Sequence, residues 1–230
     1  MDLADADIAW QMMGAVADPL IRSSFESVYA NALALSARYD EALEAATSLL
    51  STAERYRLDF AIPYGLCSAA MAYAGHRNWR SAERCLSEAS RHARLSRNLH
   101  AEQSAFAVLI RTVAQQGRHE SALAIPVPEL RSSLLAMKAE VVTSRALVLA
   151  SASRLDEASA ALAEVEGLSQ SIEQAVLTAA TTAIIKLRRN DDLAMDTVVD
   201  LEEVAFSTGA LDLLVAAYRA APELLSVLLR

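Results

Sequence analysis

Short polar turns alternate with long stretches rich in alanine and leucine, and a small residue follows each turn. The first instance is Tyr39-Asp40-Glu41, which is followed by Ala42. Four later turns are followed by alanine in the same way, which gives the marker series Ala42, Ala82, Ala122, Ala158 and Ala194. These alanines are separated by 40, 40, 36 and 36 residues. A period of about 34 residues is typical of tetratricopeptide helix pairs, and longer loops lengthen it.

Two further columns share this period. Twelve residues before the marker, four of five positions are small: Ala30, Ala70, Ile110, Ala146 and Thr182. Three residues later every position is bulky and apolar: Leu33, Tyr73, Val113, Leu149 and Ile185. Two helices alone cannot bury their apolar faces, but stacked pairs can. The columns predict an all-α fold, a right-handed α-solenoid of about five tetratricopeptide-like helix pairs with a C-terminal helical cap; chance periodicity in an alanine-rich chain is the alternative.

The predicted repeats form a single domain over residues 1–230, although a chain of 230 residues could also form two smaller domains. The repeats lie at roughly 22–56, 61–97, 100–125, 129–166 and 171–208, followed by a terminal helical segment at 210–229. Pro126 and Pro128 should cut the second helix of the third pair short, and the chain should restart at Glu129. Gly209 should end the fifth pair.

Composition supports the helical prediction, since alanine and leucine dominate while the chain has only 6 glycines and 5 prolines. The formal net charge is −8, so the overall field does not attract nucleic-acid phosphates. The acidic start, Met1-Asp2-Leu3, does not resemble a signal peptide, and no apolar run approaches the length that spans a bilayer. These features predict a cytoplasmic protein that binds neither membranes nor, by itself, nucleic acid. Cys67 and Cys85 are expected to be free thiols.

Enzyme motifs are missing from the chain. It contains no phosphate-binding GxxxxGK[ST] loop, no GxGxxG, no HExxH and no GxSxG. The four histidines have no metal-like spacing, and His119 stands in a turn column that favours a packing role. Paired carboxylates such as Glu202-Glu203 fit solvated helix faces. We therefore expect no catalytic residues, no metal and no cofactor.

Two surfaces are candidate binding sites. Five arginines project to one side of a helix when they are placed at 100° per residue: Arg77, Arg80, Arg84, Arg91 and Arg94. This basic stripe could bind an acidic partner or phosphates, because arginine presents a planar fork of donors. Alternatively, it is a solvated face whose arginine stems cover apolar surface.

The second candidate is the concave surface that the first helices of such repeats usually line. The residues expected there are Asn31, Tyr64, Met71, Arg111, Gln115 and Glu140. This mixture of aromatic, amide and charged groups would suit a peptide or a small ligand. Alternatively, curvature closes the groove and these side chains are packed.

Several segments resemble the helical repeat region of large ATP-binding LuxR-type bacterial transcription regulators. They are Ser144-Arg145-Ala146-Leu147-Val148-Leu149-Ala150, the turn Arg154-Leu155-Asp156-Glu157-Ala158, and the closing run Thr208-Gly209-Ala210-Leu211-Asp212-Leu213-Leu214. The resemblance implies that repeats over roughly 20–230 bind an inducer or regulatory proteins, with an NTPase before them and a DNA-binding helix-turn-helix after them. Neither flank lies within the 230 residues.

The leading functional hypothesis is therefore a non-catalytic region of such a regulator, which senses an effector or binds a protein. The alternative is a stand-alone tetratricopeptide-like adaptor that docks protein partners or a second copy of itself, since a solenoid end without a polar cap exposes apolar surface. A helical enzyme is a third class, but no motif favours it.

Overall fold

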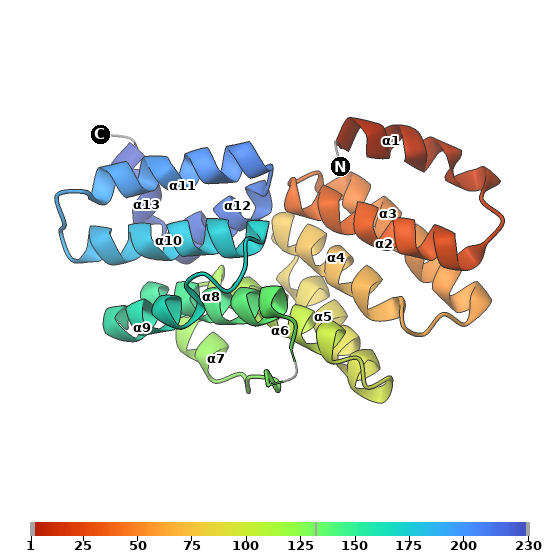
Figure 1. Cartoon of the computed structure of the whole chain (residues 1–230), viewed down its shortest axis with the longest axis horizontal. Helices are drawn as coiled ribbons and strands as arrows, with labels where there is room; N and C mark the ends of the chain where they lie inside the picture. Colours follow the sequence, from red (N-terminus) through yellow and green to blue (C-terminus); the bar gives the residue numbers. More distant parts are fainter. Residues whose placement is uncertain (1–2, 132, 229–230) are drawn as a thin grey trace. The chain divides into compact units, whose positions relative to one another are not determined.

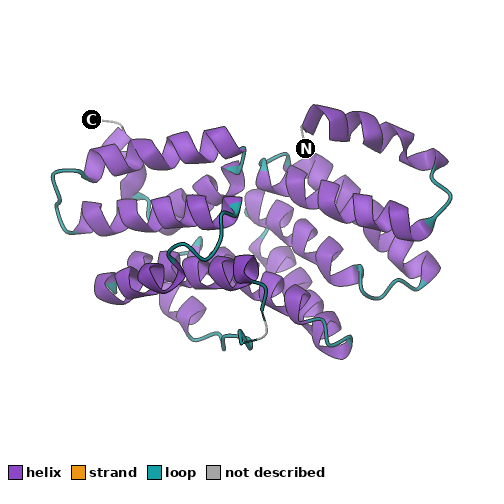
Figure 2. Cartoon of the chain, viewed as in Figure 1, coloured by secondary structure: helices purple, strands orange, loops and turns teal. Residues whose placement is uncertain are grey.

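The chain is all-helical wherever its structure is described. The computed structural model describes residues 3–131 and 133–228, apart from the side chains of residues 15, 227 and 228. Within this part it contains thirteen α-helices, a short 3₁₀ helix and no strand (Figure 2). The chain divides into two compact units, Met1–Ala105 and Phe106–Arg230, and the division falls inside α6 (Leu99–Ala114).

Neighbouring helices of the first unit pack as pairs. Besides the first part of α6, this unit contains α1 (Leu3–Met12), the 3₁₀ helix (Met13–Ala15), α2 (Pro19–Leu35), α3 (Tyr39–Tyr56), α4 (Ile62–Gly75) and α5 (Trp79–Leu95) (Figure 1). α2 packs on α3, and α4 packs on both α3 and α5. The first two predicted helix pairs are therefore present, at the positions where the columns placed them.

The second unit continues this arrangement. After the end of α6 it contains α7 (His119–Leu123), α8 (Leu135–Ser151), α9 (Leu155–Val165), α10 (Ile172–Arg188), α11 (Ala194–Thr208), α12 (Leu211–Ala220) and α13 (Glu223–Leu228). α8 packs on α9 and α10, and α10 packs on α11. Helices in neighbouring pairs are thus confirmed, while the tetratricopeptide type and the handedness remain predictions.

Four of the predicted turns close in the same way. Five positions before the marker alanine, each has one residue in the left-handed backbone region: Ala37, Arg77, Gly117 and Ser153. In the first turn the amide of Arg38 donates to the carbonyl of Leu33 at 2.9 Å, which is the closing bond of a Schellman motif. The fifth turn is out of register by one residue, because Asn190 takes the left-handed conformation there.

Small residues let the paired helices approach closely. The marker alanines Ala42, Ala82 and Ala158 are fully buried. A Cβ placed on Gly75 would lie 2.4 Å from the ring of Tyr39, so only glycine fits beside this ring. Tyr39 begins α3 and Gly75 ends α4, so this contact joins the two helices at one end.

Two boundaries of the second unit differ from those of the sequence analysis, and a proline accounts for the second. The fourth pair begins at Leu135 rather than at Glu129, because the carboxylate of Glu129 accepts a bond from the Arg131 amide and holds a local turn. The terminal segment 210–229 is not one helix, since α12 ends at Ala220 and α13 starts at Glu223. The residue before Pro222 is forced out of the helical region, and Ala221 has φ −137° and ψ 79°.

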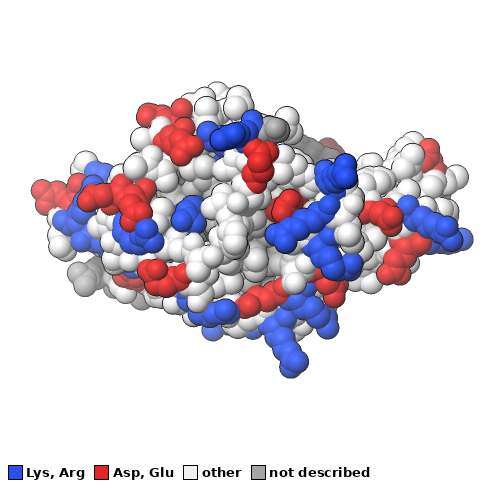
Figure 3. Space-filling model, turned by 90° about the horizontal axis from the view of Figure 1, so that it is seen from below, with Lys and Arg blue, Asp and Glu red and all other residues white. Residues whose placement is uncertain are grey.

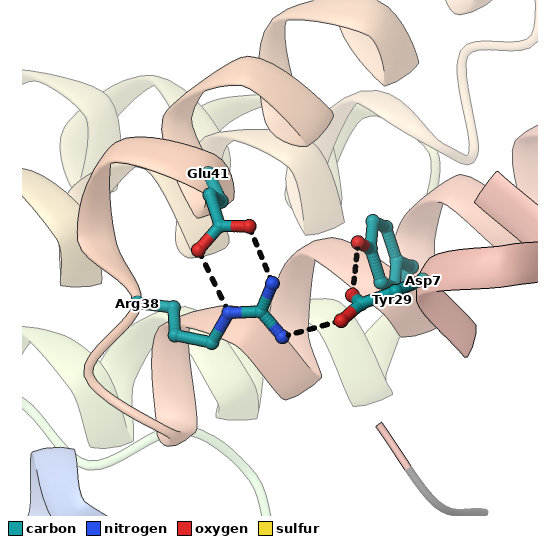
Figure 4. Close-up of polar contacts among 4 residues, drawn as sticks. All are labelled: Asp7, Tyr29, Arg38 and Glu41. Carbon is teal, nitrogen blue, oxygen red and sulfur yellow. Dashed lines mark hydrogen bonds and ion pairs between the residues drawn. The ribbon is translucent and has the colours of Figure 1, made fainter. Parts of the chain in front are cut away.

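The helix α1 was not predicted, and a polar network attaches it to the first pair (Figure 4). The hydroxyl of Tyr29 donates to Asp7 Oδ1 at 2.6 Å, and Arg38 Nη1 donates to Asp7 Oδ2 at 3.0 Å. Arg38 also binds Glu41 through two nitrogens. The ring of Trp10 stacks on that of Tyr29 at 5.1 Å between centroids. One aspartate of α1 is thereby connected to both α2 and the start of α3.

Candidate functional site

A pocket of about 680 Å³ lies in the second unit, beside the end of α9, the loop that follows it and the first part of α10. Its volume falls in the range of roughly 300–1,000 Å³ that is usual for small-molecule sites. The pocket is lined by Leu162, Ala163, Glu166, Gly167, Ser169, Gln170, Ser171, Gln174, Ala175, Thr178 and Thr182. Apolar, hydroxyl and amide groups dominate this lining, and Glu166 is its one charged residue.

The local sequence builds the pocket through an early helix end. α9 stops at Val165, and Gly167 then takes a left-handed conformation that turns the chain toward α10. Ser171 caps α10, because its hydroxyl accepts from the amide of Gln174 at 3.3 Å. α9 therefore ends alongside the start of α10, and the connecting loop borders the pocket.

Gln174 is the most constrained polar group of this pocket. Its side chain is only 9% exposed, and Nε2 donates to the carbonyl of Val165 at 2.9 Å. This bond fixes the amide orientation and leaves Oε1 buried without a hydrogen-bond donor among the described residues. A buried acceptor without a partner costs free energy that a ligand or a water could recover. The hydroxyls of Thr178 and Thr182 also form no hydrogen bond within the described chain and remain available.

The predicted groove residues of the first unit differ in exposure. Asn31 is exposed and Met71 is buried. Tyr64 is half-buried, and its hydroxyl lies 3.2 Å from His100 Nδ1 and 3.3 Å from Asn98 Nδ2. Burial lowers the pKa of His100, which favours the neutral ring at neutral pH. Of these positions, Met71 fits the packed alternative better than an open groove.

The groove residues of the second unit are largely occupied by one another or by neighbours. Arg111 Nη1 donates to Glu140 Oε1 at 3.1 Å and to Ser144 Oγ at 2.7 Å. Burial raises the pKa of Glu140, while the Arg111 guanidinium opposes that rise. Gln115 Oε1 accepts from Arg219 Nη1 at 3.2 Å. Arg111 and Glu140 thus form a structural contact with each other. That all six residues line a single binding groove stays a prediction.

The basic stripe is exposed at every one of its five positions. Arg77 precedes α5 and lies in the turn, so four arginines rather than five belong to the helix itself. The opposite face is buried as expected, with Ala82 and Leu86 fully enclosed. Arg94 pairs with Glu102 at 2.7 Å. Arg80 and Arg84 form no ion pair with any described residue, which leaves both the binding and the solvated interpretation open.

Basic and acidic side chains are both present on the face that Figure 3 shows. His119 has the packing role that its column suggested, since its Nε2 lies 3.0 Å from the Ala220 carbonyl.

Within the described residues, no disulfide joins Cys67 and Cys85, and no group of three potential ligands could hold a metal ion. None of the described helices combines the length and the apolar character needed to cross a membrane.

The pocket beside α10 was not found from the sequence. Its only sequence signal is the polar run Ser169-Gln170-Ser171 together with Thr178 and Thr182 on one side of the following helix. Comparison of the chain with protein-family models, with curated proteins and with solved structures found no match. The resemblance to LuxR-type regulators therefore stays a prediction.

Proposed function

We propose that the chain is a non-catalytic sensing module and that the pocket between α9 and α10 binds its effector. The observation that supports this is a cavity of about 680 Å³ lined by Gln174, whose buried amide oxygen has no donor among the described residues. The effector that fits is a small neutral molecule with an apolar face and at least one N–H or O–H donor. Such a molecule would pack on Leu162 and Ala175 and donate to Gln174 Oε1, which a side-chain movement must first expose because the oxygen is buried.

The sequence resemblance suggests the setting in which such sensing is used. In a LuxR-type regulator the repeats would report effector occupancy to a flanking NTPase and a DNA-binding domain. An effector can shift such a module only if it binds one conformation more tightly than another. The loop at 166–171 is the part of the pocket that could change, because it lies between two helices and one glycine sets its direction. The genomic reading frame should encode both flanking domains if this setting is correct.

The pocket can be tested with benzamide, which combines an apolar ring with amide donors. Titration followed by ¹H–¹⁵N NMR should shift backbone amides clustered over residues 162–182. Thr178→Leu should abolish these shifts by filling the pocket. Ala160→Leu adds an apolar side chain at an exposed position of α9 outside the lining, so binding should persist. Shifts scattered over the whole chain, or unchanged in Thr178→Leu, would rule out the site.

A second candidate function is that of an adaptor that associates with a second copy. α11 exposes an apolar stripe of Met195, Val199 and Phe206, which are 42%, 49% and 66% exposed. These residues lie on one side of the helix at spacings of four and seven. Sedimentation that depends on concentration, and that Phe206→Glu abolishes, would favour this function; a strict monomer would count against it.

A further inference from the structure

A second, smaller pocket lies in the first unit between α2 and α3. It has a volume of about 210 Å³, which is roughly seven times the share of one water molecule in the liquid. The pocket is lined by Arg22, Thr47, Ser48, Ser51, Thr52, Arg55 and Tyr56. Two guanidinium groups and five hydroxyls thus surround a space that suits a small polar group rather than a drug-sized ligand.

Glu26 holds the first arginine in place. Its carboxylate is fully buried, and Oε1 accepts from Arg22 Nε at 2.9 Å and from Ser48 Oγ at 2.7 Å. The hydrogen bond to Glu26 uses only the Nε atom of Arg22. The two terminal nitrogens of the Arg22 guanidinium have no partner among the described residues. Glu26 Oε2 has no donor there either. A guanidinium anchored at one edge and open at the other is arranged to receive an oxygen acid.

The side of the pocket formed by α3 supplies further donors. Ser48, Ser51, Thr52 and Arg55 follow helical spacing, so they share one face of α3. The hydroxyls of Thr47 and Ser48 already donate to the Leu43 carbonyl and to Glu26, so Ser51, Thr52 and Arg55 supply the donors that remain for a ligand. Thr52 is only 6% exposed, yet neither its hydroxyl nor that of Ser51 forms a hydrogen bond within the described chain. The Arg55 guanidinium lies 5.3 Å from the centroid of the Tyr56 ring, a cation–π contact that restrains it next to the pocket.

We propose that this pocket binds a phosphate group, either as inorganic phosphate or as a phosphate monoester. Donors converge on it from two helices, and the two arginines outnumber the single buried carboxylate that pairs with one of them. A metal cation is disfavoured because both arginines would repel it. Guanidinium groups bind phosphate oxygens in pairs, and serine and threonine hydroxyls complete such sites. This site does not depend on the effector pocket of the second unit.

Titration with inorganic phosphate and with phenyl phosphate, each at constant ionic strength in chloride, tests the site by calorimetry and ³¹P line broadening. Wild-type protein should bind at least one of the two probes and should not respond to chloride. Arg55→Gln should weaken binding by about tenfold or more, because a charge-assisted hydrogen bond is lost. Ser51→Ala, at an exposed position, should weaken it less and should fold normally.

Arg80→Gln is the matched control, since it removes an exposed helical arginine outside the pocket. It should bind phosphate as the wild type does. Tighter binding of phenyl phosphate would identify the ligand as an ester, and tighter binding of inorganic phosphate would identify the free ion. No binding by wild type, or an equal loss in Arg80→Gln and Arg55→Gln, would overturn the proposal.

Discussion

Arg111 of α6 and Glu140 of α8 form an ion pair of 3.1 Å in which the two side chains are only 4% and 15% exposed. The hydroxyl of Ser144, one turn further along α8, accepts a second bond from the same Arg111 nitrogen. Both residues stood among the candidates for an open groove. Their mutual pairing makes them a structural contact between two helices of the second unit.

Arg111→Ala is therefore expected to destabilise the fold rather than only to weaken binding. Removal of one partner leaves Glu140 buried without its countercharge, and such a change costs about 3–5 kcal/mol. Urea denaturation followed by circular dichroism measures the free energy of unfolding. Arg84→Ala, an exposed helical arginine, is the control and should change this free energy by less than about 0.5 kcal/mol. Wild-type stability in Arg111→Ala would show that the pair contributes nothing.

A pH-dependent contribution is expected from the Asp7 network. The hydrogen bond from Tyr29, followed by that from Arg38, lowers the pKa of Asp7 below its ordinary value of 3.8. A carboxyl whose pKa is lowered by folding stabilises the protein above that ordinary value, and the contribution is lost as the pH falls through the lowered pKa. Burial and the Asp7 bond raise the pKa of Tyr29 to about 12. The tyrosine contribution is correspondingly present below pH 10 and lost as the pH rises toward 12.

Tyr29→Phe tests this network because it removes the hydroxyl and keeps the ring that stacks on Trp10. The Asp7 pKa, followed by its carboxyl ¹³C shift, should rise toward 3.8 in the variant. Tyr56→Phe, at an exposed tyrosine outside the network, should leave the Asp7 titration unchanged. An unchanged Asp7 pKa in Tyr29→Phe would contradict the assigned cause.

Gly75→Ala should destabilise the pairing of α3 with α4. The new methyl group would lie 2.4 Å from the Tyr39 ring, so the ring must move away from its edge contact with His76. Overpacking of this kind costs about 1–3 kcal/mol. In the Tyr39→Ala background, which lacks the ring, Gly75→Ala should lower the free energy of unfolding much less than it does in the wild-type protein. Additive free energies would mean that the ring and the glycine do not interact.

The helix pairs could be predicted because their signals are local. Marker alanines such as Ala82 follow a turn and are buried in the helix pair. Bulky residues such as Leu33 are also buried, and the backbone carbonyl of Leu33 accepts the hydrogen bond that closes the helix. The missed helix α1 lacks such a signal, since only Ala6 of it is buried and its attachment depends on Arg38, 31 residues from Asp7. A contact at that separation cannot be read from one sequence.

The candidate sites were harder to predict for the same reason. The repeat bounds placed the end of α9 at residue 166, one residue from the observed Val165, but the pocket beside α10 also depends on how the 166–171 loop packs against α10. Arg111 was expected on the concave surface, but its pairing with Glu140 depends on the register of α6 against α8. The pocket between α2 and α3 combines Arg22 with residues about 25 to 34 positions later. Each site is formed by side chains from segments that pack against one another. The repeat columns align equivalent positions of the helix pairs but do not indicate which side chains meet.

The helix-ending turns have a consequence for the unfolded chain. Ala37, Arg57 and Ser153 are among six residues other than glycine that adopt positive φ in the described part of the chain. Each is strained by on the order of 1–2 kcal/mol in the folded state. Each also narrows the conformations open to the unfolded chain, which glycine would widen. The strain is the larger of the two effects, so glycine at any of these positions is expected to raise the free energy of unfolding. The left-handed turns are therefore held by the packing of the helices that they join, and not by the conformational preference of the turn residue.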